Sequence, residues 1–314
     1  MSINLPSLRQ LQYLVALAER LNFRAAAEAC FVTQSTLSAG IKELEAGLGA
    51  QLVERHTRSV RLTSAGTEVL ERARRLLAAA SDLVQNAAAS REPLSGPLHL
   101  GVIPTIAPFL LPRVLPGLRA RYPKLGLYLR EDLTERLLER LRGAELDLAL
   151  IALPYDTGEL ALRELFRDEF WFVARPDDPL AKPKAIAVEK LDVADVILLE
   201  EGHCLREHAI AACGAVPQAE RSRIEATSLP TLLQMVEGGL GVTLLPELAL
   251  KAGMLNGTKL VARPFSTRVP ARILALVARP ASARGREMEL LAKLIIERAA
   301  PASRAGIPAL RRRR

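Results

Sequence analysis

The sequence predicts an N-terminal winged helix-turn-helix, a long helix and a C-terminal α/β domain with two lobes. Three observations lead to this prediction. Short amphipathic segments and two strand-like ones fill residues 1–65, and an unbroken apolar helical period runs through residues 67–90. Strand-like and helix-like segments then alternate, as in α/β folds. We expect domains at 1–65, 66–91 and 92–300, followed by a tail at 301–314.

Composition describes an ordinary globular protein, with 314 residues, 49% hydrophobic and 25% charged. There is no apolar run of about 20 residues and no signal pattern, so we predict a cytoplasmic protein without membrane association. The net charge is +8. Arg304 and Arg311 to Arg314 supply five of the positive charges within an acid-free tail, which we expect to be solvated and disordered. Bulk charge is therefore weak evidence for nucleic-acid binding.

The first fifty residues predict three helices. Leucines recur at helical spacing through 8–20, and a short alanine-rich helix is expected around 23–30. Thr33 is placed to cap the third helix. Its apolar stripe should face the core and consists of Leu37, Ile41, Leu44 and Leu48. A short helix, a three-residue turn and a longer helix form a helix-turn-helix.

The outer face of the third helix carries short polar side chains that can approach phosphates and base edges. Strand-like 52–55 and 60–62 follow and flank a basic turn, which predicts a wing. A purely structural helical hairpin is the alternative. The candidate contacts to double-stranded DNA are Thr33, Gln34, Ser35, Thr36, Ser38, Lys42, Arg55 and Arg58.

Residues 67–90 predict a helix of about six turns. The small winged domain does not need its apolar stripe, so we expect the helix to pack on a second copy of the chain. A homodimer would present two recognition helices to two half-sites. The stripe consists of Val69, Leu70, Ala73, Leu76, Leu77, Ala80 and Val84.

After the break "REPLSGP", the alternation predicts two α/β lobes joined by two crossovers. Lobe I should cover about 92–166 and 274–300, and lobe II about 167–273. Ligands of such folds bind where strands end and helices begin. Thr105 and Thr134 both fall at strand-to-helix turns of this kind.

Two of the three cysteines lie nine residues apart in "EEGHCLREHAIAAC". Cys204 follows the strand-like "VILLE" at the start of a predicted helix. The helix N-terminus, His203 and Arg206 should favour its thiolate, whereas Glu200 and Glu201 oppose it.

The spacing of the pair restricts its chemistry. If the segment is helical, the Cα atoms of Cys204 and Cys213 lie about 13 Å apart, whereas a disulfide needs about 4.4–6.8 Å. Three other interpretations stay open: two buried structural cysteines, a metal site that adds His208, and a thiol peroxidase. A metal site would need Cys213, which is too far along the helix. Cys30 is most simply a small apolar filler.

The segment "FRAAAEACFVTQSTLSAGIKELEAGLGAQLVERHTRSVRLTSAG" resembles the winged helix-turn-helix of the LysR-type transcriptional regulators. The resemblance implies a dimerising linker helix and an effector domain shaped like a type 2 periplasmic binding protein. Two departures stand out, because the family often has proline at Ser35 and glutamine at Gly40. A glycine in an exposed helix costs about 1 kcal/mol relative to alanine, and here it would remove a base-reading side chain.

The segment "LLEEGHCLREHAIAAC" is similar to the redox segment of the peroxide-sensing members of that family. The resemblance implies that Cys204 is the peroxidatic cysteine and Cys213 the resolving one. Arg130 stands where some relatives have histidine, so its role is open. The implied hydrogen peroxide pocket is formed by Thr105, Thr134 and His203, with Arg206 and Arg272 supporting the thiolate.

The function implied by this resemblance is transcriptional activation of antioxidant genes through a reversible disulfide. It further implies a homotetramer that contacts RNA polymerase when oxidised and is reset by a thiol reductant such as glutaredoxin. No cofactor, metal or enzymatic turnover is expected. The rivals are a LysR-type regulator with a conventional small-molecule effector between its lobes and a peroxide-consuming enzyme.

Overall fold

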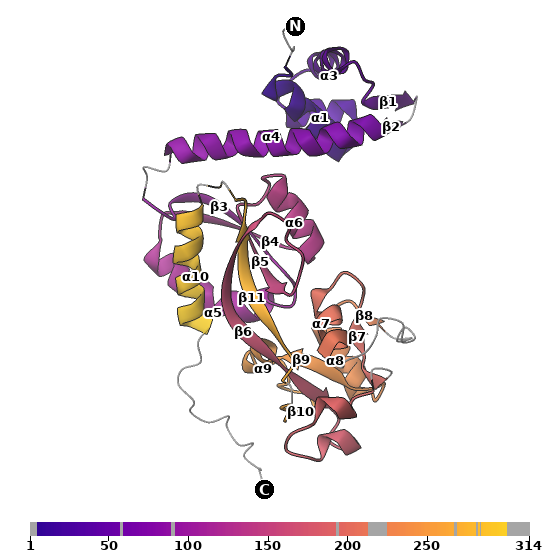
Figure 1. Ribbon diagram of the computed structural model, residues 1–314, viewed down its shortest axis with the longest axis vertical. Helices are drawn as coiled ribbons and strands as arrows, with labels where there is room; N and C mark the ends of the chain where they lie inside the picture. The colour runs from indigo at the N-terminus through magenta and orange to yellow at the C-terminus, as the bar shows by residue number, and fades with distance from the viewer. Residues whose placement is uncertain are drawn as a thin grey trace. The chain divides into compact units, whose positions relative to one another are not determined.

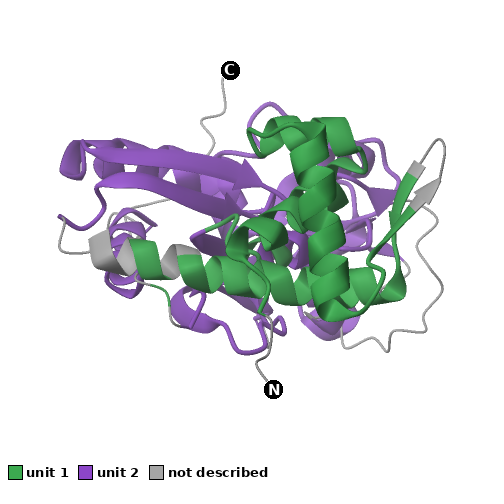
Figure 2. Ribbon diagram, turned by 90° about the horizontal axis from the view of Figure 1, so that it is seen from above, with its two compact units in different colours: residues 1–91, 139–146, 281–283 green, residues 92–138, 147–280, 284–314 purple. Residues whose placement is uncertain are grey.

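The computed structural model describes residues 5–56, 59–88, 92–192, 195–212, 225–266, 269–280, 282 and 284–299. The chain divides into two compact units (Figure 2). The first consists of residues 1–91 with 139–146 and 281–283, and the second of 92–138, 147–280 and 284–314. Among the described residues, no helix is both long and apolar enough to cross a membrane.

The first unit begins with α1 (Leu8–Arg20), α2 (Phe23–Ala29) and α3 (Gln34–Leu48). Each helix starts at a side-chain cap, because its first N–H groups have no partner within the helix. Thr33 caps α3 as predicted, its hydroxyl accepting the Thr36 N–H at 3.2 Å. The core between the helices is apolar and includes Leu14, Leu17, Leu37, Ile41 and Leu44.

The wing follows as an antiparallel pair, β1 (Val53–His56) and β2 (Ser59–Leu62), with Val53 opposite Leu62. The Glu45 carboxylate of α3 accepts the N–H groups of Leu52 and Val53 at 2.8 and 3.0 Å, which fastens the wing to the helix. The long helix α4 (Ser64–Ala88) comes next. The predicted winged helix-turn-helix and long helix are therefore confirmed.

Two expectations about α3 were wrong. Gly40 is not on the exposed face but buried, and a Cβ atom there would lie 2.6 Å from Cδ2 of Tyr13. The glycine therefore allows α1 and α3 to pack closely, and it does not stand in for a base-reading side chain. Leu48 does not complete the core stripe either, because it is the last residue of α3 and is 40% exposed.

The second unit contains a curled mixed sheet with the strand order β10-β6-β11-β5-β3-β4, and β9 also pairs with β6 (Figure 1). β3 runs parallel to β4 and β5, whereas β11 and β6 run antiparallel to their neighbours. The strands are β3 (Gly96–Val102), β4 (Leu125–Glu131), β5 (Leu148–Leu153), β6 (Ala161–Ala174), β9 (Thr243–Pro246), β10 (Val261–Arg263) and β11 (Ala271–Ala278).

The long strand β6 connects the two halves of this sheet. Its first part pairs with β11, and its end pairs with β9 and β10. A separate parallel pair consists of β7 (Leu198–Leu199) and β8 (Glu225–Ala226). The helices are α5 (Ala107–Arg121), α6 (Thr134–Arg142), α7 (Cys204–Ala212), α8 (Leu229–Glu237), α9 (Glu247–Lys251) and α10 (Gly285–Ala299), with short 3-10 turns at Pro179–Ala181 and Val188–Lys190.

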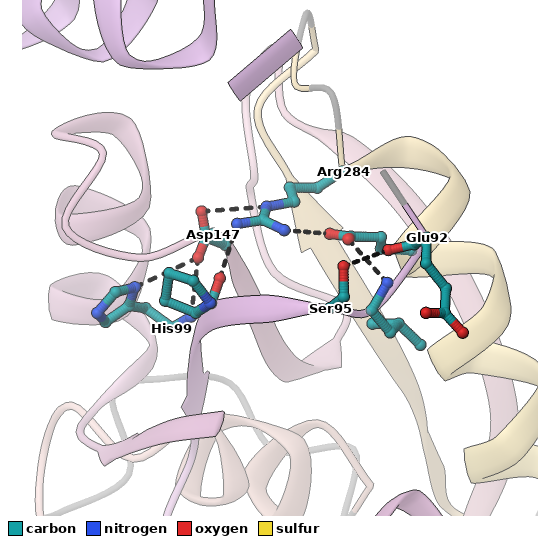
Figure 3. Close-up of polar contacts among 8 residues, drawn as sticks. Glu92, Ser95, His99, Asp147 and Arg284 are labelled. Atoms are coloured by element: carbon teal, nitrogen blue, oxygen red, sulfur yellow. Dashed lines mark hydrogen bonds and ion pairs between the residues drawn. The ribbon is translucent and has the colours of Figure 1, made fainter. Parts of the chain in front are cut away.

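A polar cluster fastens the first strand of this unit to its last helix. Figure 3 shows Asp147 between His99 and Arg284. Asp147 accepts the His99 N–H at 2.8 Å and pairs with Arg284 at 3.5 Å. Arg284 also reaches Glu287, whose other oxygen accepts the Leu94 N–H at 3.0 Å. The start of β3 is thereby held against α10.

Candidate functional site

A fully buried guanidinium lies at the centre of the site. Arg272 of β11 stands opposite Asp168 of β6 in the ladder, and its Nε donates to the Asp168 carboxylate at 3.0 Å. Its Nη1 and Nη2 donate to the hydroxyl and carbonyl of Thr105 at 2.8 and 3.0 Å. Asp168 in turn accepts the Leu248 N–H at 2.9 Å. A buried ion pair is tolerated when its remaining groups are hydrogen-bonded, and here they hold the cation in place.

Two threonines come to this centre from strand-to-helix turns, as the sequence predicts. Thr105 follows β3, and Thr134 begins α6 after β4. Both are buried. The Thr134 hydroxyl has no formed hydrogen bond, yet it lies close enough to the Cys204 thiol to lower the pKa of that thiol. A buried hydroxyl without a formed bond is unusual and often marks a functional position.

Cys204 is the first residue of α7 and is 4% exposed. Burial raises the pKa of its thiol above the ordinary value of 9.0, while the Arg272 charge and the Thr134 hydroxyl oppose this rise. The local features that were expected to favour the thiolate do not determine its pKa, because removal from water outweighs the favourable charges. The resting group is a neutral thiol with a cation nearby.

The close approach of Cys204 to Thr134 depends on a glycine. Gly202 has φ +93, and a Cβ atom there would meet Cδ1 of Leu133 at 3.0 Å. Only glycine adopts this backbone without strain. The loop before α7 can therefore lie against the β4–α6 turn.

Arg206 and His203 do not supply the positive charge that the sequence suggested. The Arg206 guanidinium donates to the Leu199 carbonyl at 3.0 Å and to the Glu225 carboxylate at 2.8 Å. His203 is buried, and burial lowers its pKa although Glu200 lies 3.8 Å away. Arg272 is therefore the cation that acts on the thiol.

His208 was expected on the helix surface, but it is 6% exposed. Its Nε2 lies 3.1 Å from the Pro154 carbonyl oxygen. Asp168 was also missed, because its role follows from a strand register between residues 104 positions apart. Arg130, whose role the sequence left open, is half-exposed, and its guanidinium pairs with the Asp132 carboxylate at 3.7 Å.

Part of the predicted site lies outside the described residues, namely Cys213 and Arg58. Within the ranges that the structure does describe, no group of three or more His, Cys, Asp or Glu side chains could hold a metal ion. Cys30 is half-buried at the end of α2, where burial raises its pKa.

The candidate nucleic-acid interface is the outer side of α3. Thr33, Gln34, Ser35, Thr36 and Lys42 are exposed and Ser38 is half-buried. The Thr33 hydroxyl bonds those of Ser35 and Thr36 at 2.8 Å, which orders the start of the helix. Arg55 lies within β1. Phe31, which no sequence pattern singled out, is 96% exposed and lies shortly before α3 in the chain.

The comparisons with known proteins agree with this architecture. Residues 8–67 match the bacterial regulatory helix-turn-helix protein model of the lysR family, and residues 91–300 match the LysR substrate binding domain. The chain belongs to the LysR family. It is therefore a DNA-binding transcription regulator with a periplasmic-binding-protein-like effector domain.

Three members of the LysR family illustrate its relationships. The HTH-type transcriptional regulator EstR of Acinetobacter baylyi is 44% identical, covering 93% of this chain and 96% of EstR. A probable hydrogen peroxide-inducible genes activator of Mycobacterium avium is 42% identical, and the match covers 93% of this chain and 94% of that protein. The structure of a full-length OxyR variant from Pseudomonas aeruginosa superposes with a TM-score of 0.77 at 36% identity, covering 92% and 94%.

Proposed function

We propose that this regulator senses hydrogen peroxide at Cys204, forms a Cys204–Cys213 disulfide and thereby controls antioxidant genes. The observation that carries the proposal is the convergence of a buried thiol, the Arg272 guanidinium and an unbonded Thr134 hydroxyl. The names of the Mycobacterium avium and Pseudomonas aeruginosa relatives support it.

The groups around Cys204 suit the reduction of a small peroxide. Attack by sulfur on one peroxide oxygen breaks the O–O bond and expels hydroxide, which leaves as water after taking the thiol proton. Negative charge develops first on sulfur and then on the leaving oxygen. We propose that Arg272 stabilises the former and that the Thr105, Thr134 and His203 side chains donate to the latter.

The resulting sulfenic acid would condense with the Cys213 thiol, releasing a second water and forming the disulfide. Two thiols of a reductant such as glutaredoxin would return both cysteines to the reduced state. Because the chain belongs to a family of transcription regulators, we propose that each oxidation serves to switch the regulator and that the chain is a sensor and not a turnover enzyme.

The fold offers a route from the disulfide to DNA. Along α7, the Cα atoms of Cys204 and Ala212 lie about 12 Å apart. The Cα atoms of two disulfide-bonded cysteines lie only about 4.4–6.8 Å apart. The helix must therefore unwind. We propose that this alters packing within a cytoplasmic homotetramer, joined partly through exposed apolar residues of α4 such as Leu76, Leu83 and Val84. The oxidised assembly would then reposition α3 and the wing, including Arg55 and Arg58, on double-stranded DNA and engage RNA polymerase.

The decisive experiment is mass spectrometry of the reduced chain after one equivalent of hydrogen peroxide. We expect a peptide pair joined through Cys204 and Cys213. A chain that stays fully reduced, or that joins other cysteines, would contradict the proposal.

The raised pKa of the Cys204 thiol, and the 44% identity to EstR, whose name does not mention peroxide, favour one second candidate, a regulator with a conventional small-molecule effector. A Cys204→Ser variant separates the two. If it loses the transcriptional response to peroxide, the thiol is the sensor; a full response to the inducer would support the effector.

A further inference from the structure

We propose that His208 is a positioning residue that latches α7 in the reduced conformation through the Pro154 carbonyl, and that the oxidised conformation takes up a proton at this imidazole. The inference rests on the proposed function, since it concerns the switch between the two redox states. It adds a linkage between peroxide sensing and pH that the peroxide chemistry alone does not contain.

The hydrogen bond assigns the tautomer of His208. A carbonyl oxygen only accepts, so Nε2 carries the proton and donates to Pro154 at 3.1 Å. The bond joins α7 to the residue directly after β5. It is a contact that α7 can make only while this turn of the helix is intact.

The same tautomer leaves Nδ1 as a bare acceptor, and Nδ1 is buried without a hydrogen-bond partner. The side chain is 6% exposed. Protonation would place an unpaired N–H and a positive charge in this position, which is unfavourable in a dry site. The intact helix therefore holds the imidazole neutral.

The charged surroundings act in the same direction. Burial is the largest cause that lowers the pKa of His208, and the Arg272 charge on β11 lowers it further, whereas the bond to Pro154 raises it. Asp168 is already bonded to Arg272. The neighbouring β7 contributes Leu198 and Leu199 and no charge, while α7 itself carries Cys204, Glu207 and Arg206, whose guanidinium is paired with Glu225.

Disulfide formation removes these constraints. Because α7 cannot stay fully helical once Cys204 is joined to Cys213, the turn that carries His208 leaves the Pro154 carbonyl. A solvated imidazole has a pKa near 6.5. The oxidised state therefore binds a proton that the reduced state excludes, and acid shifts the equilibrium toward the disulfide.

The test is the thiol–disulfide equilibrium with glutathione between pH 5.5 and 7.5. One oxidised glutathione and the two protein thiols give the Cys204–Cys213 disulfide and two reduced glutathiones, so the exchange itself consumes no proton. In the wild-type chain, protonation of His208 should raise the equilibrium constant up to about tenfold as pH falls across this range.

Two substitutions separate the latch from the proton. In His208→Gln the amide can still donate to Pro154 but does not titrate. The equilibrium constant of this variant should therefore lack the rise of up to about tenfold that His208 causes between pH 7.5 and pH 5.5. In His208→Leu the donor is lost as well, and the constant at pH 7.5 should exceed that of His208→Gln by about fivefold. The pH dependence of His208→Gln must be compared with that of the wild-type chain, because His203 can also contribute to it. His203 lies directly before α7, and burial lowers its pKa as well.

His99 provides the control. Its side chain is 46% exposed and its ring lies 3.4 Å from Asp147, so His99→Gln should keep the wild-type pH dependence. Equal pH dependence in wild type and His208→Gln would overturn the proton linkage, and equal constants for the Gln and Leu variants at pH 7.5 would overturn the latch. If no chain forms the disulfide at any pH, the proposed function falls together with the inference.

Discussion

The Arg272 guanidinium and the Asp168 carboxylate face each other across two antiparallel strands, 3.0 Å apart, with 0% and 2% of their side chains exposed. The strands β11 and β6 thus carry the charges of the site on rigid backbone. Residues on such strands hold their geometry better than residues on loops.

Asp168→Ala should strongly destabilise the effector domain, because it leaves the Arg272 charge buried without its partner. Loss of one member of a buried pair costs about 3–5 kcal/mol. Urea denaturation will measure the free energy of unfolding. The matched control is Glu169→Ala, which removes a half-exposed ion pair to Arg167 at 3.6 Å and should change the free energy by less than about 1 kcal/mol. Similar losses in both variants would contradict this role for Asp168.

Thr134→Val should separate reactivity from stability. The hydroxyl has no formed hydrogen bond, so an isosteric apolar side chain should leave the free energy of unfolding within about 1 kcal/mol of wild type. Peroxide oxidation of Cys204 should nevertheless slow by about tenfold or more, because a donor to the leaving oxygen is gone. Stopped-flow oxidation followed by acid quench will give the rate. An unchanged rate would remove Thr134 from the peroxide pocket.

The raised pKa of Cys204 predicts an unusual pH profile for alkylation. Modification by iodoacetamide requires the thiolate, so its rate at Cys204 should keep rising through pH 9, whereas a thiolate at rest would give a plateau above pH 7. Peptide mapping will distinguish Cys204 from Cys30, whose pKa is also raised. The same rise in pKa determines how the free energy of unfolding depends on pH. The thiol's contribution is complete below the unfolded pKa and declines as pH rises toward the folded one.

The sequence predicted those parts of the site that follow local rules. Thr105, Thr134 and Cys204 were found because each stands where a strand gives way to a helix. Asp168 could not be found in this way, since its importance arises from a register between distant strands. The direction of the Cys204 pKa shift could not be predicted for a related reason: local charges are visible in a sequence, but burial is set by the whole domain and outweighs them.

Gly40 supplies the last prediction, because the structure reverses its expected meaning. Gly40→Ala should destabilise the winged domain by about 1–3 kcal/mol, since the added methyl group would lie 2.6 Å from the Tyr13 ring in the core. Thermal unfolding will measure this loss. Gly47→Ala is the matched control in the same helix. Its Cβ would meet nothing within 4 Å, so it should stabilise α3 by about 0.5–1 kcal/mol. If Gly40→Gln instead preserved stability and tightened DNA binding, α3 would present this position to DNA and not to Tyr13.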